Sequence, residues 1–117
     1  MDVLKPRFRV ILSTEVKLFL KSLPPKVTDK IAYNLKKAQY VQDKDLFKKL
    51  GGCDIWEFRT AYQGHAYRLL AFWDSETDSL VVVTHGFIKK SQKTPAKEID
   101  KAIELRRIYL SNKKSLL

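Results

Sequence analysis

The sequence has few of the residues that build disulfides and long irregular loops, and it has no long apolar run. It has one cysteine, four glycines and four prolines among 117 residues. The single cysteine, Cys53, excludes an internal disulfide and a metal site made of several cysteines. No apolar run is long enough to cross a bilayer, and the start of the chain, MDVLKPRFRV, does not resemble a signal peptide. We therefore expect a single cytoplasmic domain that spans residues 1–117.

Acidic residues are also scarce. The chain has 13 Asp and Glu against 23 Lys and Arg, a net charge of +10. This excess is uneven, because residues 1–50 carry a net +7 and residues 81–117 a net +6, whereas residues 51–80 carry −3. A basic field of this size favours polyanions such as nucleic acid or an acidic partner, although lysines also serve solubility alone. Composition leaves both interpretations open.

Hydrophobic periodicity predicts an α+β fold with the order β-α-α-β-β-β-α. We expect a twisted, mainly antiparallel sheet with the helices packed on one face. Ser13 is a predicted helix N-cap, the Pro24-Pro25 pair separates two helices, and Thr94 with Pro95 predicts the start of the last helix. The predicted strands are 7–12, 55–62, 67–73 and 80–88. The predicted helices cover 13–23, 25–38 and 94–110, residues 42–50 form a charged connector, and the tail at 111–117 is expected to fray.

The register of the first hairpin places two arginines opposite each other. If Gln63 and Gly64 form a two-residue turn, Arg59 lies directly across from Arg68 on one face. Like charges in this arrangement repel, so we expect either a bound anion or Glu57, two residues along the same face, to neutralise them.

The register of the second hairpin decides where the histidine falls. If Trp73 pairs with Leu80, then His85 lies opposite Arg68, with Lys89 on the same face nearby. A slip of one residue would move His85 to the other face.

Such a row suits the cleavage of a phosphodiester, which needs cations around the phosphate, a base for the 2′-hydroxyl and an acid for the leaving oxygen. Arginine binds phosphate, and His85 or Glu57 is a candidate base. Each residue also has a structural interpretation, as a solvated arginine, an ion-paired glutamate or a packed histidine. Trp56 and Trp73 are expected in the core rather than as stacking platforms for bases.

Three segments make the sequence similar to a known family: LPPKVTDKI, LGGCDIWEFRTAYQGHAYRLLAFW and VVVTHGFIKKSQKTP. They resemble the RelE/HigB toxin superfamily, most of all its phage-derived HigB-like branch. The resemblance implies the toxin of a type II toxin–antitoxin system, a ribosome-dependent mRNA endonuclease that works without metal or cofactor. It also implies three partners, namely mRNA in the ribosomal A site, rRNA and a cognate antitoxin that is commonly a helix-turn-helix protein, and no membrane association.

The resemblance and the predicted register together indicate two sets of candidate site residues in this chain. The catalytic candidates are Arg68, Arg59, His85, Lys89 and Glu57, and the RNA-binding candidates are Lys48, Lys49, Lys90 and Lys93. The tyrosine that some members use near the C-terminus has only Tyr109 as a distant counterpart here, and we assign it no role. The alternative function is a non-catalytic RNA- or antitoxin-binding module with the same fold.

Overall fold

The computed structural model describes residues 5–77, 79–90 and 93–115. Within these residues, five strands form one sheet in the order β1-β5-β4-β3-β2. β1 runs parallel to β5, and the other neighbouring strands are antiparallel. Along the chain the elements are β1 (Arg9–Leu12), α1 (Thr14–Lys21), α2 (Pro25–Tyr40), β2 (Phe47–Lys49), β3 (Trp56–Tyr62), β4 (His65–Asp74), β5 (Leu80–Lys89) and α3 (Ala96–Ser115).

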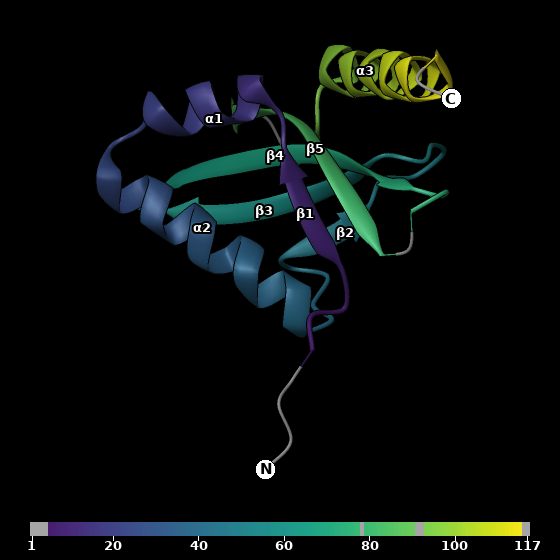
Figure 1. Cartoon of the computed structure of the whole chain (residues 1–117). Helices are drawn as coiled ribbons and strands as arrows, with labels where there is room; N and C mark the ends of the chain where they lie inside the picture. Colours follow the sequence, from purple (N-terminus) through teal and green to yellow (C-terminus); the bar gives the residue numbers. More distant parts are fainter. Residues whose placement is uncertain (1–4, 78, 91–92, 116–117) are drawn as a thin grey trace.

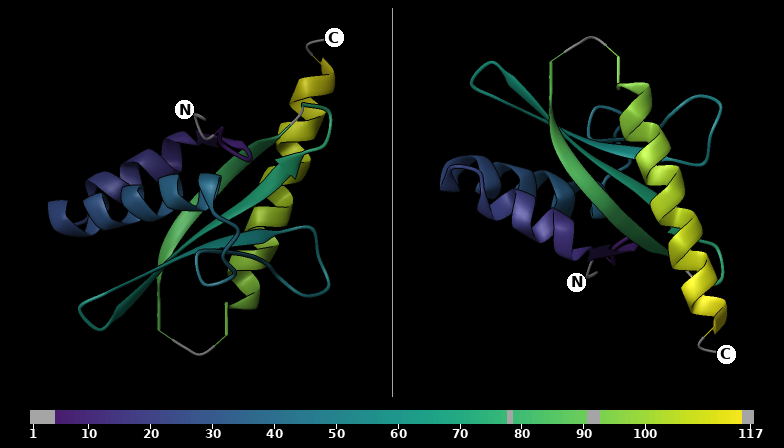
Figure 2. Two further views of the ribbon diagram at one scale, coloured as in Figure 1. Left: turned by 90° about the horizontal axis from the view of Figure 1, so that it is seen from below. Right: turned by 90° about the horizontal axis from the view of Figure 1, so that it is seen from above.

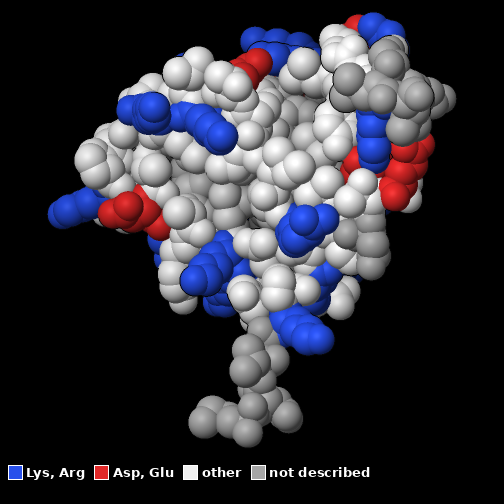
Figure 3. Space-filling model, viewed as in Figure 1, with Lys and Arg blue, Asp and Glu red and all other residues white. Residues whose placement is uncertain are grey.

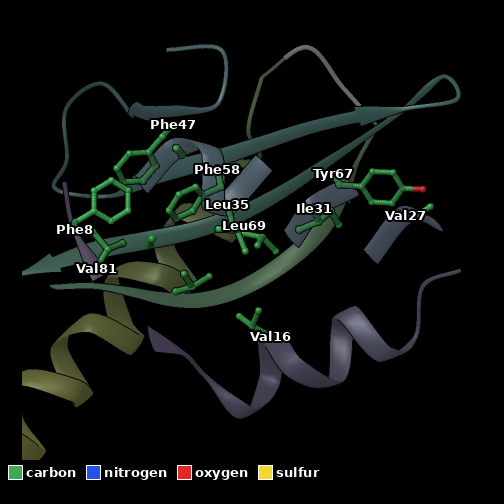
Figure 4. Close-up of a cluster of buried hydrophobic side chains, with 13 residues drawn as sticks. Phe8, Val16, Val27, Ile31, Leu35, Phe47, Phe58, Tyr67, Leu69 and Val81 are labelled. Carbon is green, nitrogen blue, oxygen red and sulfur yellow. The ribbon is translucent and has the colours of Figure 1, made fainter. Parts of the chain in front are cut away.

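The sheet has helices on both faces, with α1 and α2 on one and α3 across the other (Figures 1 and 2). The expected α+β class is confirmed, and the expected packing on one face holds for α1 and α2 but not for α3. The cause lies in β4, which is apolar on both faces: Leu69 belongs to the core under α1 and α2, whereas Leu70 and Phe72 pack with Ala102 of α3. Figure 4 shows the larger of the two cores, built around Phe8, Ile31 and the sheet.

The helix boundaries follow local signals in two cases and depart from them in the third. Ser13 caps α1 as predicted, since its Oγ accepts a hydrogen bond from the Val16 N–H at 3.1 Å. Pro25 is the first residue of α2, as expected. The predicted cap at Thr94 is wrong: α3 begins at Ala96, the Pro95 carbonyl accepts its first hydrogen bonds, and the Thr94 hydroxyl binds elsewhere.

The last helix is longer than periodicity predicts. It continues to Ser115, into the segment that the sequence predicts to fray. Two side chains hold it against the end of β4, because Lys113 Nζ and the Tyr109 hydroxyl both donate to Asp74 Oδ2, at 2.6 and 2.8 Å. Tyr109 therefore has a structural partner far along the helix from the arginine pair.

The predicted connector at 42–50 contains a strand. β2 pairs with the edge of β3, with Phe47 opposite Phe58 and Lys48 opposite Glu57. Three residues with two lysines show no periodicity of their own, so only the pairing with β3 reveals the strand. Within the described residues, none of the helices is both long and apolar enough to span a membrane.

Candidate active site

The β3–β4 hairpin brings Arg59 and Arg68 directly opposite each other, as the sequence predicts. Gln63 and Gly64 form the two-residue turn with positive φ angles of 47° and 81°. Positive φ at both positions is the conformation that matches the twist of a tight hairpin, so this turn determines the register.

A buried carboxylate lies against both arginines. Glu57 Oε1 is 3.3 Å from Arg68 Nε and 3.6 Å from Arg59 Nε, and the Glu57 side chain is only 4% exposed. The Thr94 hydroxyl, from the segment before α3, donates a hydrogen bond to the other oxygen of Glu57. Glu57 thus neutralises part of the repulsion between the two arginines, which was one of the two expected solutions.

The two guanidinium groups keep hydrogen-bonding capacity. Both Nε atoms are buried, and neither makes a hydrogen bond to the described part of the chain, although each forms an ion pair with Glu57. Arg68 Nη1 donates to the Tyr67 carbonyl at 3.0 Å, which holds the group in place. Burial, and then the charge of Arg59, lower the pKa of Arg68, against the opposing effect of Glu57.

Two lysines from the flanking strands complete the cluster. Lys89 of β5 pairs with Ala66, next to Arg68 on the same face, and Lys48 of β2 pairs with Glu57. Burial lowers the pKa of the Lys89 ammonium, and the charges of Arg68, Arg59 and Lys48 lower it further. Four cations from four strands therefore surround one carboxylate. We call Lys48, Glu57, Arg59, Arg68 and Lys89 the arginine cluster.

A small cavity of about 160 Å³ opens beside the pair. Arg59 and Arg68 line it, together with Thr60, Ala61 and the carboxylate-bearing Asp45. The arrangement can bind an oxyanion between two forked cationic donors, and it has a lysine of lowered pKa next to them that can release a proton.

The predicted pairing of His85 with Arg68 is wrong. Phe87 lies opposite Arg68, and His85 lies opposite Leu70. Two shifts of one residue cause the difference. The turn pairs Asp74 with Leu80, one step from the expected register, and an irregularity between Leu70 and Ala71 adds a second step. Because two single steps restore the side-chain alternation, His85 still belongs to the face of Arg68.

His85 is packed beneath α3 and is only 2% exposed. Its Nε2 lies 3.4 Å from Glu98 Oε1, and its Nδ1 is 3.0 Å from the Thr84 hydroxyl. Burial lowers the pKa of this imidazole, as does the charge of Lys101, while Glu98 and Glu15 oppose the shift. The structure thus places His85 on the expected face but under a helix rather than in the row of cations.

The other RNA-binding candidates lie outside the cluster. Lys49 pairs with Trp56 and therefore belongs to the opposite face, where it also forms an exposed ion pair with Asp54 at 3.8 Å. Lys90 and Lys93 are exposed, after β5 and before α3. Thr94, which binds Glu57, was not among the predicted site residues. Its position in the KKSQKTP segment, one of the segments that carry the family resemblance, could have indicated it. In the described residues, no group of three or more His, Cys, Asp or Glu is arranged to hold a metal ion.

The sequence and the structure were both compared with known proteins, and the two comparisons are consistent with each other. The family model for "Phage derived protein Gp49-like" matches residues 18–107. No curated protein is similar enough in sequence to be matched.

Several solved structures are similar in shape, and two of them illustrate the match. A mutant of the Escherichia coli toxin RelE in the free state superposes with a TM-score of 0.60 at 16% identity, covering 86% of this chain and 97% of the other. The toxin–antitoxin complex RelBE2 of Mycobacterium tuberculosis has a chain that superposes with a TM-score of 0.56 at 20% identity, covering 73% and 100%. The match to the family model over most of the chain and the shared architecture lead to one conclusion: this chain belongs to the phage-derived Gp49-like family and has the fold of RelE toxins.

Proposed function

We propose that this protein is the toxin of a type II toxin–antitoxin module and cleaves mRNA on the ribosome. The observation that carries the proposal is the pairing of Arg59 with Arg68 inside a cluster of four cations. The fold supports the same function, because solved proteins of similar fold are toxins, and one of them is in a complex with an antitoxin.

In this proposal the arginines hold the scissile phosphate. Their guanidinium groups donate to the non-bridging oxygens and stabilise the additional negative charge that develops as the 2′-hydroxyl attacks phosphorus. The P–O5′ bond then breaks, which leaves a 2′,3′-cyclic phosphate on one product and a 5′-hydroxyl on the other. The cations carry the charge that a metal supplies in other nucleases, so no cofactor is required.

Lys89 and Glu57 are the proposed acid and base. The lowered pKa of Lys89 brings its ammonium closer to the range in which it can give a proton to the leaving 5′-oxygen. Glu57 is the carboxylate nearest the two arginines and is the candidate acceptor for the 2′-hydroxyl proton, and its ion pairs also orient both guanidinium groups. His85 takes no part in this scheme, because α3 covers it.

The proposed setting is the cytoplasm, with mRNA and rRNA as partners and an antitoxin as the inhibitor. Exposed cations such as Lys90 and Lys93 lie on the segments that flank the cluster and are proposed to contact RNA. An antitoxin partner fits the RelBE2 complex, in which a chain of similar fold is bound by its antitoxin.

The test is primer extension on an mRNA under translation, with the wild type and Arg68→Ala compared at equal ribosome occupancy. We expect new 5′ ends with the wild type and about 10²- to 10³-fold slower cleavage with the variant, the usual loss for one donor to a developing oxyanion. Arg107→Ala is the matched control, since Arg107 is exposed on α3 and pairs with Glu104. The downstream product of each cut should carry a 5′-hydroxyl, which a kinase can label directly.

Absence of new 5′ ends despite ribosome binding would contradict the proposal. That result would instead favour the alternative, a module of the same fold that binds RNA or an antitoxin without cleaving. Cleavage by Arg68→Ala at the wild-type rate would remove Arg68 from the mechanism. Circular dichroism of each variant shows whether its fold is intact, because Arg68 is 7% exposed and contributes to packing.

A further inference from the structure

A second cavity lies on the other face of the sheet from the arginine cluster. Its volume is about 340 Å³, which falls in the range of small-ligand pockets. Trp56, Trp73 and Phe47 form its apolar part. Trp56 alternates with Glu57 along β3, so the two side chains belong to opposite faces of the sheet. The aromatic part of the cavity therefore lies on the opposite face from the proposed centre of cleavage, and Lys48 belongs both to the arginine cluster and to the lining of this cavity.

The tryptophans are only partly in the core. Both pack against the buried cluster, as expected from the sequence, yet both remain partly exposed and line the cavity. Their rings meet edge to face at 6.0 Å, and the Phe47 ring stacks on Trp56 at 4.8 Å with an interplanar angle of 27°. These contacts hold rigid aromatic surfaces at the wall of an open cavity.

Basic side chains surround these aromatic rings. Arg7, Lys44, Lys48 and Lys49 line the cavity, against the single carboxylate of Asp43. Arg7 Nη2 donates to the carbonyls of Ala38 at 2.7 Å and Val41 at 3.1 Å, which fixes the guanidinium at the end of α2. Figure 3 shows Lys and Arg side chains gathered around the segment that enters β1 and the end of α2.

We infer that this cavity binds one nucleotide of a single-stranded RNA. An aromatic wall accepts the face of any base, and the surrounding cations bind the adjoining phosphates, which is the combination that single-strand binding sites use. The Asp43 carboxylate does not cancel this field, because four cations line the same cavity. Binding here needs no cleavage, so the site extends the RNA contact surface beyond the proposed active site.

The sequence provides a direct probe, because its only two tryptophans both line the cavity. The purified full-length chain is titrated with a 2′-O-methyl hexaadenylate, which lacks the nucleophilic 2′-hydroxyl and cannot be cleaved. We expect saturable quenching of tryptophan fluorescence that weakens as salt is added. Replacing both Lys44 and Lys49 by alanine should reduce affinity about tenfold and lower the magnitude of the log–log salt slope by about 1.4, since each phosphate contact on a single strand contributes about 0.7.

Two controls isolate the site. The double variant Lys17→Ala with Lys21→Ala removes the same charge from the exposed surface of α1 and should retain nearly all of the affinity. Arg59→Ala removes a phosphate contact of the proposed active site and none of the residues that line this cavity, so saturable quenching should persist in it even if mRNA cleavage is abolished. Failure of the proposed function and failure of this inference are therefore distinguishable. Lys48 is left intact, because it contributes to both sites.

Each of three results with the oligonucleotide would overturn the inference: no saturable quenching, wild-type affinity in the Lys44 and Lys49 double variant, or loss of saturable quenching in Arg59→Ala. Stronger quenching by a hexaglutamate peptide than by the oligonucleotide would also overturn it and would assign the cavity to an acidic protein segment.

Discussion

Arg59 and Arg68 face each other across β3 and β4, and the Nε atoms of both lie within 3.6 Å of a single oxygen of Glu57. Two like charges in adjacent strands repel, so the pair persists because a buried carboxylate offsets part of the repulsion. The arrangement leaves two forked donors close together next to a cavity, with a lysine of lowered pKa beside them.

Glu57→Gln should destabilise the fold and make the stability of the variant depend on a bound anion. Removal of the carboxylate leaves two facing guanidinium groups without their counter-charge, and losing one partner of a buried ion pair costs about 3 kcal/mol. Sulfate should therefore raise the melting temperature of the variant more than that of the wild type, with NaCl of equal ionic strength as the reference. Thr94→Val keeps the carboxylate and removes one hydrogen bond, so we expect a loss of only about 1 kcal/mol. Equal responses of the wild type and Glu57→Gln to sulfate would contradict this account.

Gly86→Ala should destabilise the protein through a steric clash between β5 and α1. A Cβ at this position would lie 2.5 Å from Phe19 Cδ2 and 2.6 Å from Leu69 Cδ2. Overpacking of a core costs about 1–3 kcal/mol, which chemical denaturation would measure. Phe19→Leu removes the ring atoms that the new methyl meets, so the double variant should be more stable than the sum of the single effects predicts. Strict additivity would show that Leu69 or the backbone, rather than Phe19, moves to accommodate the methyl group.

Asp74 should make stability sensitive to strong acid. Burial tends to raise the pKa of its carboxyl, but hydrogen bonds from Lys113, Tyr109 and the Glu76 N–H outweigh burial and lower this pKa to about 2. Since the pKa is below its ordinary 3.8, the folded state holds its proton less tightly. The stabilisation is complete above about pH 4 and is lost as the pH falls toward 2, with a total of about 2 kcal/mol.

Urea denaturation at pH 7, 4 and 2.5 tests this window. Asp74→Asn should be less stable at pH 7 and should lose less stability on acidification than the wild type. Asp54→Asn is the matched control, because the Asp54 side chain is 73% exposed. A wild type and an Asp74→Asn variant with parallel pH profiles would rule out the proposed linkage.

His85 should add a separate pH dependence at milder acidity. Its pKa is lowered by burial and by Lys101, against Glu98 and Glu15, so the unfolded chain binds the proton before the folded chain does. Stability is therefore retained above the ordinary pKa of 6.5 and falls as the pH drops below it. His85→Gln should remove this slope between pH 7.5 and 5.5 while leaving the acid window of Asp74 in place. A slope that is unchanged in the variant would assign the effect to other groups.

Local chemistry in the sequence determines the first hairpin and hence the arginine pair. Gln63 and Gly64 form a tight turn, and once the turn is set, alternation along both strands places Arg59 opposite Arg68. The same kind of local signal predicts the cap at Ser13 and the start of α2 at Pro25. Such features depend on neighbours a few residues apart, so they can be read from the chain.

Only the tertiary structure decides where His85, Phe47 and Thr94 go. The position of His85 depends on a longer turn and an irregularity in the β4–β5 pairing, neither of which has a unique local signature. Phe47 becomes part of a strand because β3 offers an unpaired edge, and Thr94 binds Glu57 because α3 crosses the sheet above it. These outcomes arise from contacts between segments that are distant in the chain, whereas the sequence alone determines the paired arginines around which the candidate site is built.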